Sequence, residues 1–201
     1  MKHKIEQNLE ERKESWDNDY WYWKSGISHE DCQKIINLSE DSWNLASTFG
    51  SAGIRKSDIV WITEQWVYDL ISPYMFDANE QAGGKYNIVA AESCQITRYT
   101  KGGFYSWHKD ANGSHNTARN LPNNKHLHGH VRKLSMSILL NDDYEGGHFQ
   151  ISEDDRKDLI APVSEKGAVI VFPSFIEHQV TPVTKGTRYS LVTWFVGPPF
   201  V

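Results

Sequence analysis

Residues 92–110 read ESCQITRYTKGGFYSWHKD. The first part of this stretch, Glu92–Tyr99, is short, rich in β-branched and aromatic residues and followed by glycines, which is typical of a β-strand. Three later segments have the same character and are also bounded by Gly, Pro or Asn: Val131–Leu140, Gly167–Phe172 and Thr187–Val196. Short strands separated by turns predict a β-sandwich or a double-sheet jelly roll for the C-terminal half of the chain.

The residues before these strands have a mostly helical pattern. Ser28-His-Glu-Asp31 resembles a capping box at the start of a first helix. A second helix is expected from near Trp61, because apolar residues then recur at three- and four-residue spacing, at Ile62, Trp66, Leu70, Ile71 and Tyr74. Pro73 leaves the far end of that helix open. Both helices are expected to pack on the outside of a sheet.

The length of 201 residues and the absence of repeats or composition breaks predict a single domain spanning 1–201. We expect an α+β, mainly β fold, with a helical part over about 1–85 and a jelly-roll core over about 86–201.

Charge and cysteine content exclude several classes of protein. The net charge of −5 gives no electrostatic footprint for nucleic acid, although it leaves a local basic patch open. Cys32 and Cys94 make neither a disulfide framework nor a metal-ligand spacing, which favours a reduced, cytoplasmic setting. The start of the chain lacks the apolar stretch of a signal peptide, and no run approaches the length of a membrane span.

A candidate metal site begins with His108 and Asp110. These residues stand two apart, so on extended backbone their side chains face the same way. His178 follows a predicted strand and a turn, from which it could approach them on a neighbouring strand. Two imidazoles and one carboxylate suit Fe(II) with three open positions better than tetrahedral zinc. A lone His-x-Asp is more often an ordinary polar pair near a strand end, so this interpretation depends on its surroundings.

The segment Thr187–Val196 alternates in a way that points to an anion site. Arg188 and Ser190 share one face with Val192 and Trp194. If this face is interior, the guanidinium needs a partner, because a buried unpaired cation is costly. A carboxylate ligand would satisfy it through paired hydrogen bonds, and Ser190 could donate to the same anion. The alternative is that the faces are reversed and Arg188 is solvated, since the other face also carries apolar residues.

Three segments together resemble prolyl 4-hydroxylase-type 2-oxoglutarate/Fe(II) oxygenases, particularly their bacterial and phage-like branch. The resemblance extends from about residue 25 to the end, and Arg55-x-Ser57 and Trp61-Ile62 are similar to that family's N-terminal region. The three segments are Tyr99-x-x-Gly102-x-x-Tyr105-x-x-His108-x-Asp110, Arg132-Lys-Leu-Ser135-Met-Ser137-Ile-Leu139-Leu-Asn141 with the following Glu145-Gly146-Gly147, and His178-Gln-Val180 continuing to Arg188-Tyr-Ser190.

The resemblance implies a role for each matching residue. His108, Asp110 and His178 would hold Fe(II). The co-substrate 2-oxoglutarate would chelate the metal, and its distal carboxylate would pair with Arg188 and accept a hydrogen bond from Tyr99, with Ser190 a lesser candidate for the same pocket. The iron pocket or its mouth would be lined by Tyr105, Ser135, Ser137, Leu139, Val180 and Trp194. No catalytic residue is assigned beyond the iron centre, and ascorbate is a further candidate cofactor.

The implied activity is hydroxylation of an unactivated C–H bond by dioxygen, with decarboxylation of 2-oxoglutarate to succinate. A prolyl residue in a peptide or protein is the favoured substrate. A free amino acid or another small molecule stays open, because one fold and iron centre serve many substrates. A nucleic-acid demethylase is disfavoured, since Trp194 stands where that branch has a second Arg. An alternative of another class is a non-catalytic metal-binding jelly roll that acts as a binding module.

The polar, turn-rich segment 111–130 is long for a loop in a compact domain. It is interpreted either as a substrate lid or as a disordered insert. Its alternating His126, His128 and His130 could form a second metal site on extended backbone, but solvated loop residues are the favoured interpretation. The sequence does not indicate the oligomeric state.

Overall fold

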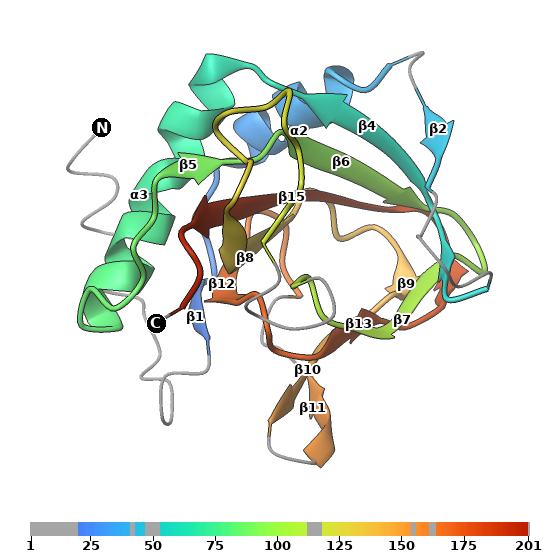
Figure 1. The fold of residues 1–201 in the computed structure, drawn as a ribbon. Coiled ribbons are helices and arrows are strands. Elements are labelled where there is room, and N and C mark those ends of the chain that lie inside the picture. The colour runs from blue at the N-terminus through green and yellow to red at the C-terminus, as the bar shows by residue number, and fades with distance from the viewer. Residues whose placement is uncertain are drawn as a thin grey trace.

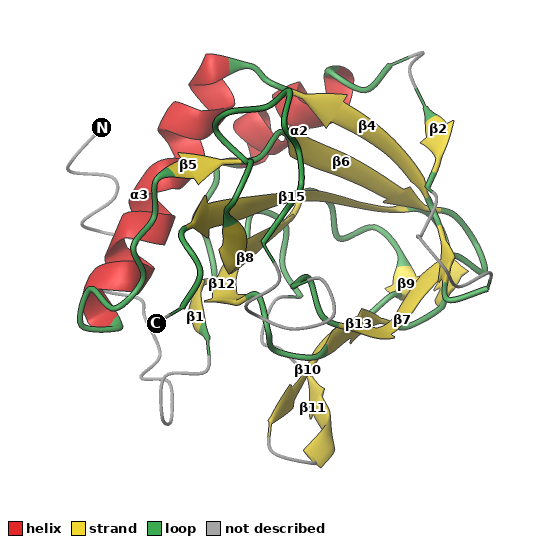
Figure 2. Cartoon of the chain, in the orientation of Figure 1, coloured by secondary structure: helices red, strands yellow, loops and turns green. Residues whose placement is uncertain are grey.

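The fold is mainly β and built on antiparallel sheets (Figures 1 and 2). The computed structural model describes residues 20–40, 43–46, 53–111, 118–153, 156–160 and 164–200. Within these ranges the large sheet has the order β1 (Trp21–Trp23), β12 (Val169–Pro173), β8 (Val131–Leu139), β15 (Arg188–Gly197), β6 (Cys94–Tyr99), β4 (Asp58–Ile62) and β2 (Asn44–Leu45), and β5 (Ala90–Ala91) pairs with β15.

A second, smaller sheet lies opposite part of the large one. Its order is β11 (Arg156–Ile160), β10 (Phe149–Glu153), β13 (His178–Val180), β7 (Phe104–His108) and β3 (Arg55–Lys56), and a separate pair joins β14 (Val183–Lys185) to β9 (Glu145–Gly146). Apolar side chains from both sheets meet in one cluster, which includes Tyr99, Phe149, Phe172 and Val180. All four strands predicted in the C-terminal half are confirmed within a few residues, as β6, β8, β12 and β15.

The described residues contain two helices, α2 (His29–Asn37) and α3 (Gln65–Gln81). The predicted capping box is confirmed, because the Ser28 side chain accepts a hydrogen bond of 3.1 Å from the Asp31 backbone N–H. Neither helix is long and apolar enough to cross a membrane.

The expected start of the second helix was wrong. Trp61 and Ile62 lie in strand β4, and α3 begins only at Gln65. The Asp58–Ile62 segment is rich in β-branched residues, and its pairing with β6 outweighs the three- and four-residue spacing. Pro73 lies inside α3 and does not end it. The N-terminal part of the chain therefore contributes strands β1 to β4 to the sheets as well as two helices.

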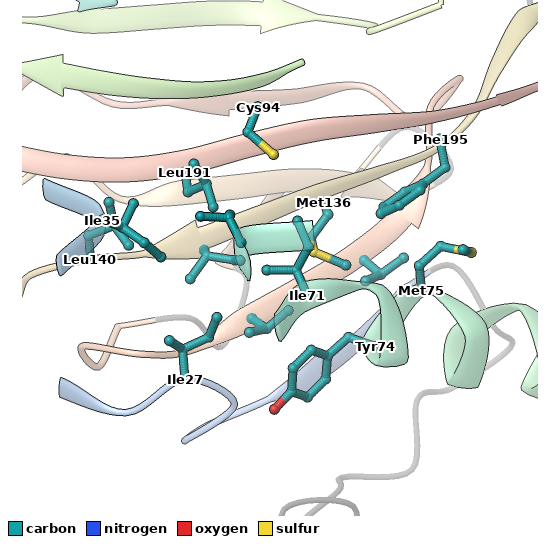
Figure 3. Close-up of a cluster of buried hydrophobic side chains, with 14 of the residues drawn as sticks. Ile27, Ile35, Ile71, Tyr74, Met75, Cys94, Met136, Leu140, Leu191 and Phe195 are labelled. Atoms are coloured by element: carbon teal, nitrogen blue, oxygen red, sulfur yellow. The ribbon is translucent and has the colours of Figure 1, made fainter. Parts of the chain in front are cut away.

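One face of the large sheet packs against the helices. Ile71 and Met75 of α3 lie beside Met136 and Phe195 of the sheet in the main buried cluster (Figure 3). Along β8 the side chains alternate, so that Leu134, Met136 and Ile138 join this cluster while Ser135 and Ser137 point to the opposite face. The polar residues of the strands are thereby directed away from the helices and toward the second sheet.

We predict that Ile71→Ala lowers the free energy of unfolding by about 2–5 kcal/mol, because it leaves a cavity where a fully buried side chain packs. Urea denaturation followed by circular dichroism measures the change. The matched control on the same helix is Phe76→Ala, since Phe76 is 63% exposed and its loss should cost less than about 0.5 kcal/mol. Equal effects of the two substitutions would contradict this packing of α3.

Candidate metal centre

The three predicted metal ligands converge in the structure. His178, at the start of β13, is the antiparallel partner of His108, at the end of β7. Asp110 follows β7 by two residues. Their ligand atoms all lie within 4.8 Å of one another, and this is the one such group of at least three His, Cys, Asp or Glu residues in the described part of the chain. Strand pairing thus brings together ligands that are 70 positions apart in the sequence.

The hydrogen bonds of the two imidazoles leave the right atoms free for a metal. His108 Nδ1 lies 2.7 Å from the Ser106 carbonyl oxygen, and His178 Nδ1 lies 3.1 Å from that of Ile176. A carbonyl oxygen only accepts, so each Nδ1 carries the hydrogen, and in a neutral imidazole of this tautomer Nε2 presents a lone pair. Backbone carbonyls orient metal-binding histidines in this way in many proteins.

Asp110 completes the donor set. The distance from its Oδ1 to His108 Nε2 is 3.9 Å, and the distance from its Oδ2 to His178 Nε2 is 3.5 Å. Oδ2 is buried and has no hydrogen-bond partner among the described residues. A buried unpaired carboxylate oxygen is costly, and a cation between it and the two imidazoles would remove that cost. The residues present therefore fit a divalent metal ion.

The electrostatic surroundings hold the ligands in their metal-binding forms. Burial, and secondly the neighbouring His178, lower the pKa of His108 to about 3. Burial alone would raise the pKa of Asp110, but His178, Arg132 and His108 outweigh it and lower this pKa to about 2. At neutral pH His108 is consequently uncharged and Asp110 is a carboxylate, as metal coordination requires. The Tyr105 ring stacks on His108 with 3.4 Å between ring centroids and further fixes the imidazole plane.

Arg188 lies on the interior face of β15. The alternative in which the faces are reversed and Arg188 is solvated is therefore wrong. The residue is 2% exposed. Its Nη1 donates to Ser190 Oγ at 3.0 Å, and its guanidinium carbon is 5.5 Å from the centroid of the Tyr99 ring. Its Nε is buried without a hydrogen-bond partner, and no Asp or Glu of the described ranges forms an ion pair with it. This guanidinium has a vacant donor for an anionic ligand.

The metal ligands and Arg188 line one cavity of about 790 Å³. Tyr99 and Ser190 also line it, as do four of the predicted pocket residues, Tyr105, Ser137, Val180 and Trp194. The other two, Ser135 and Leu139, are buried but do not line it, and Ser135 donates a hydrogen bond to Ser174 Oγ at 2.9 Å.

Sequence analysis missed a charged network beside the metal ligands. Arg132 donates to both carboxylate oxygens of Glu92, through Nε at 2.7 Å and Nη2 at 2.8 Å. Its Nη1 donates to the Asp110 carbonyl oxygen at 3.2 Å, and its guanidinium lies 3.7 Å from the centroid of the Trp194 ring. Arg119 pairs with the same Glu92 carboxylate at 3.0 Å. The network holds the backbone at Asp110, a candidate metal ligand, in place.

The long segment before β8 contributes to the cavity wall. Residues 118–121 line the cavity, whereas residues 112–117 lie outside the described ranges. His126, His128 and His130 are exposed or half-buried, and they form no metal-binding group within the part of the chain that is described. His130 Nδ1 instead lies 2.8 Å from the His126 carbonyl oxygen.

A family model described as the 2OG-Fe(II) oxygenase superfamily matches residues 94–196, which include the triad and Arg188. The chain belongs to this superfamily. The two cofactors that the superfamily name contains, Fe(II) and 2-oxoglutarate, agree with the donor set and with the Arg188 guanidinium in the cavity, whose Nε has no hydrogen-bond partner among the described residues.

Curated relatives and solved structures agree with this assignment. A PKHD-type hydroxylase of Sphingopyxis alaskensis is 38% identical over 104 residues, which cover 49% of this chain and 41% of the relative. Human prolyl 3-hydroxylase 2 is 41% identical over 71 residues, covering 34% of this chain and 10% of the relative. The chain spans about two fifths of the length of the PKHD-type relatives that it matches.

The fold is that of prolyl hydroxylases of known structure. The viral collagen prolyl hydroxylase from Paramecium Bursaria Chlorella virus-1 superposes with a TM-score of 0.65 at 19% identity, covering 89% of this chain and 96% of that chain. The Pseudomonas putida prolyl-4-hydroxylase gives 0.64 at 20% identity, covering 97% and 98%.

We predict that His108→Ala weakens binding of Mn(II) by more than about 100-fold, the upper end of losses seen even for outer-shell partners of metal ligands. Isothermal titration calorimetry of the full chain measures the affinity. His148→Ala serves as the control, because His148 is exposed and lies outside the cavity lining. Unchanged affinity in the His108 variant would remove this residue from the metal site.

Proposed function

We propose that this chain is a 2-oxoglutarate- and Fe(II)-dependent dioxygenase that hydroxylates an unactivated C–H bond, with a prolyl residue in a peptide or protein as its substrate. The observation that carries the proposal is the position of Arg188. A buried guanidinium, whose Nε has no hydrogen-bond partner among the described residues, shares one cavity with the His-Asp-His group. In that group Asp110 and His178 are buried and His108 is half-buried. A single ligand that chelates a metal and ends in a carboxylate could bind both the metal site and Arg188, and 2-oxoglutarate is such a ligand.

Each side chain of the site then has a physical task. Fe(II) would be held by His108 Nε2, His178 Nε2 and the Asp110 carboxylate. Arg188 would orient 2-oxoglutarate by receiving its distal carboxylate, and Ser190, whose oxygen accepts from Arg188, keeps its own hydrogen to donate. When bound, the metal and 2-oxoglutarate supply the oxidising chemistry, in which 2-oxoglutarate is decarboxylated to succinate and one oxygen atom of dioxygen enters the C–H bond.

The prolyl substrate is supported by what the relatives are called. Human prolyl 3-hydroxylase 2, the viral collagen prolyl hydroxylase and the Pseudomonas putida prolyl-4-hydroxylase are all named for it. A prolyl hydroxylase from Trichoplax adhaerens has been solved with a peptide fragment of hypoxia inducible factor, and it superposes with a TM-score of 0.62. The open cavity of about 790 Å³ has room for part of a peptide as well as for 2-oxoglutarate.

We further propose that the two facing sheets form a double-stranded β-helix, the cupin-like jelly roll expected from the sequence, and that residues 1–201 make up one domain. Support comes from the apolar cluster that both sheets share and from the cavity that lies between them. The cytoplasmic location and the use of ascorbate stay predictions.

Two measurements test this function: first the binding of 2-oxoglutarate under anaerobic conditions, and then its turnover under aerobic conditions. The full chain with Fe(II) should convert 2-oxoglutarate to succinate, and mass spectrometry of proline-containing peptides should find a gain of one oxygen atom. Conversion with a free amino acid alone would move the substrate class to small molecules. Absence of both binding and turnover of 2-oxoglutarate would favour a non-catalytic binding module and contradict the proposal.

We predict that Arg188→Met weakens binding of 2-oxoglutarate to the Mn(II)-loaded chain by roughly 10- to 100-fold, because charge-assisted hydrogen bonds to the distal carboxylate are lost. Arg188→Lys should lose less, since it keeps the charge without the paired geometry. Fluorescence or calorimetric titration gives both affinities. Arg98→Met is the matched control, because Arg98 pairs with Asp58 outside the cavity. Wild-type affinity in the Met variant would contradict the assigned role.

A further inference from the structure

The cavity is cationic although the chain is acidic. The whole protein has a net charge of −5. The described residues that line the cavity nevertheless include five cationic side chains, those of Arg55, Lys109, Arg119, Arg132 and Arg188, and only two carboxylates, those of Glu92 and Asp110. A cavity lined by one sign of charge concentrates ligands of the opposite sign.

Part of this charge is already accounted for. Arg188 has the distal carboxylate of 2-oxoglutarate as its proposed partner, Asp110 belongs to the metal, and Lys109 is exposed to solvent. The remaining charges are three guanidinium groups, on Arg55, Arg119 and Arg132, against the single carboxylate of Glu92. These four side chains therefore carry an excess of positive charge that is paired with neither the metal site nor the proposed co-substrate.

The Glu92 carboxylate pairs with both Arg119 and Arg132, and all three side chains are mostly buried. Its side chain is 6% exposed, and those of Arg119 and Arg132 are 18% and 14% exposed. Burial, and secondly the nearby Arg132, lower the pKa of the Arg119 guanidinium. Trp194, beneath Arg132, has a buried Nε1 without a hydrogen-bond partner in the described ranges. This donor adds to the shortage of acceptors.

Among the described residues, the hydrogen-bond partners of Arg55 are neutral groups. Its Nε donates to Ser57 Oγ and its Nη2 donates to Gln95 Oε1, both at 2.8 Å. Its guanidinium carbon lies 4.7 Å from the centroid of the Tyr105 ring, which in turn stacks on the metal ligand His108. No carboxylate of the described residues pairs with Arg55. The Tyr105 ring thus lies between the Arg55 guanidinium and the candidate metal ligand His108.

The Glu92 network and the co-substrate site lie at opposite ends of one strand. Tyr99 pairs with Arg188 at the start of β15, whereas the Glu92 N–H donates to the Trp194 carbonyl oxygen. Arg188 and Trp194 are six positions apart along β15, which corresponds to roughly 20 Å. Arg132 reaches the Asp110 carbonyl oxygen from the Trp194 end. An anion bound there would lie near the backbone of Asp110 and away from Arg188.

We propose that the primary substrate carries a carboxylate close to the C–H bond that reacts, and that Arg55 and the Arg119–Arg132 pair receive it. This inference rests on the proposed function, and it names the chemical class of the substrate. The carboxylate can belong to an acidic side chain of a peptide or to the α-carboxylate of a free amino acid. Both sources present the same planar anion to guanidinium donors.

The test uses the full chain loaded with Mn(II) and 2-oxoglutarate under anaerobic conditions. A random decapeptide pool is incubated with the immobilised protein, and the retained peptides are sequenced by mass spectrometry. We expect enrichment of Asp and Glu over Asn and Gln by about tenfold at one or more positions, with a smaller ratio at high salt. A second arm compares free L-amino acids with their carboxamides by thermal shift, and stabilisation by the acids alone assigns the free amino acid as the source.

Variants connect the preference to these residues. Arg55→Met and Arg119→Met should each reduce the enrichment, and Arg119→Glu should shift it toward Lys and Arg. Arg98→Met, a guanidinium paired with Asp58 and stacked on Trp43 outside the cavity, should retain it.

The inference is overturned if acidic and amide residues are retained equally and amino acids stabilise no more than carboxamides, or if neither pool binds. Binding of 2-oxoglutarate is measured on the same samples. If it binds and the acidic preference is missing, only this inference fails, whereas its failure to bind contradicts the proposed function itself.

Discussion

The site depends on the antiparallel pairing of β13 with β7, which sets His178 opposite His108. Two imidazoles that donate to backbone carbonyls leave their Nε2 lone pairs beside a carboxylate oxygen that has no partner among the described residues. Each such buried acceptor costs about 1–3 kcal/mol when it is left unpaired. A cation between Asp110 Oδ2 and the two imidazoles would remove this cost, and the ligand atoms of the three residues lie within 4.8 Å of one another.

Side chains alternate between the two faces of each strand, so one face of the large sheet packs in the apolar core and the other lines the cavity. On β15, Leu191 and Phe195 belong to the core beneath the helices, whereas Arg188, Ser190 and Trp194 face the cavity. The same strand therefore contributes both to the apolar core and to the proposed co-substrate site. A shift of register by one residue would exchange the two faces, so packing against α3 fixes the direction in which Arg188 points.

Local patterns predicted those parts of the structure that depend on neighbours in sequence. β-Branched and aromatic content, together with Gly, Pro or Asn at the boundaries, predicted the four C-terminal strands, and Ser28 marked the start of α2. The helix expected from Trp61 was wrong, because pairing of β4 with β6 decides that segment and a single sequence does not show which strands pair. The interior position of Arg188 had to stay open, since both faces of its strand carry apolar residues. The pairing of Glu92 with Arg132 could not be predicted from the sequence, because the two residues are 40 positions apart. Arg132 lies on β8 and Glu92 just before β6, and these two strands are the neighbours of β15 on either side.

The most direct measurement is a crystal structure of the full chain grown anaerobically with Mn(II) and 2-oxoglutarate. Our expectation is that the ion lies between His108 Nε2, His178 Nε2 and the Asp110 carboxylate, with the distal carboxylate of 2-oxoglutarate on the Arg188 guanidinium. An ion bound elsewhere, or a co-substrate carboxylate turned away from Arg188, would contradict it.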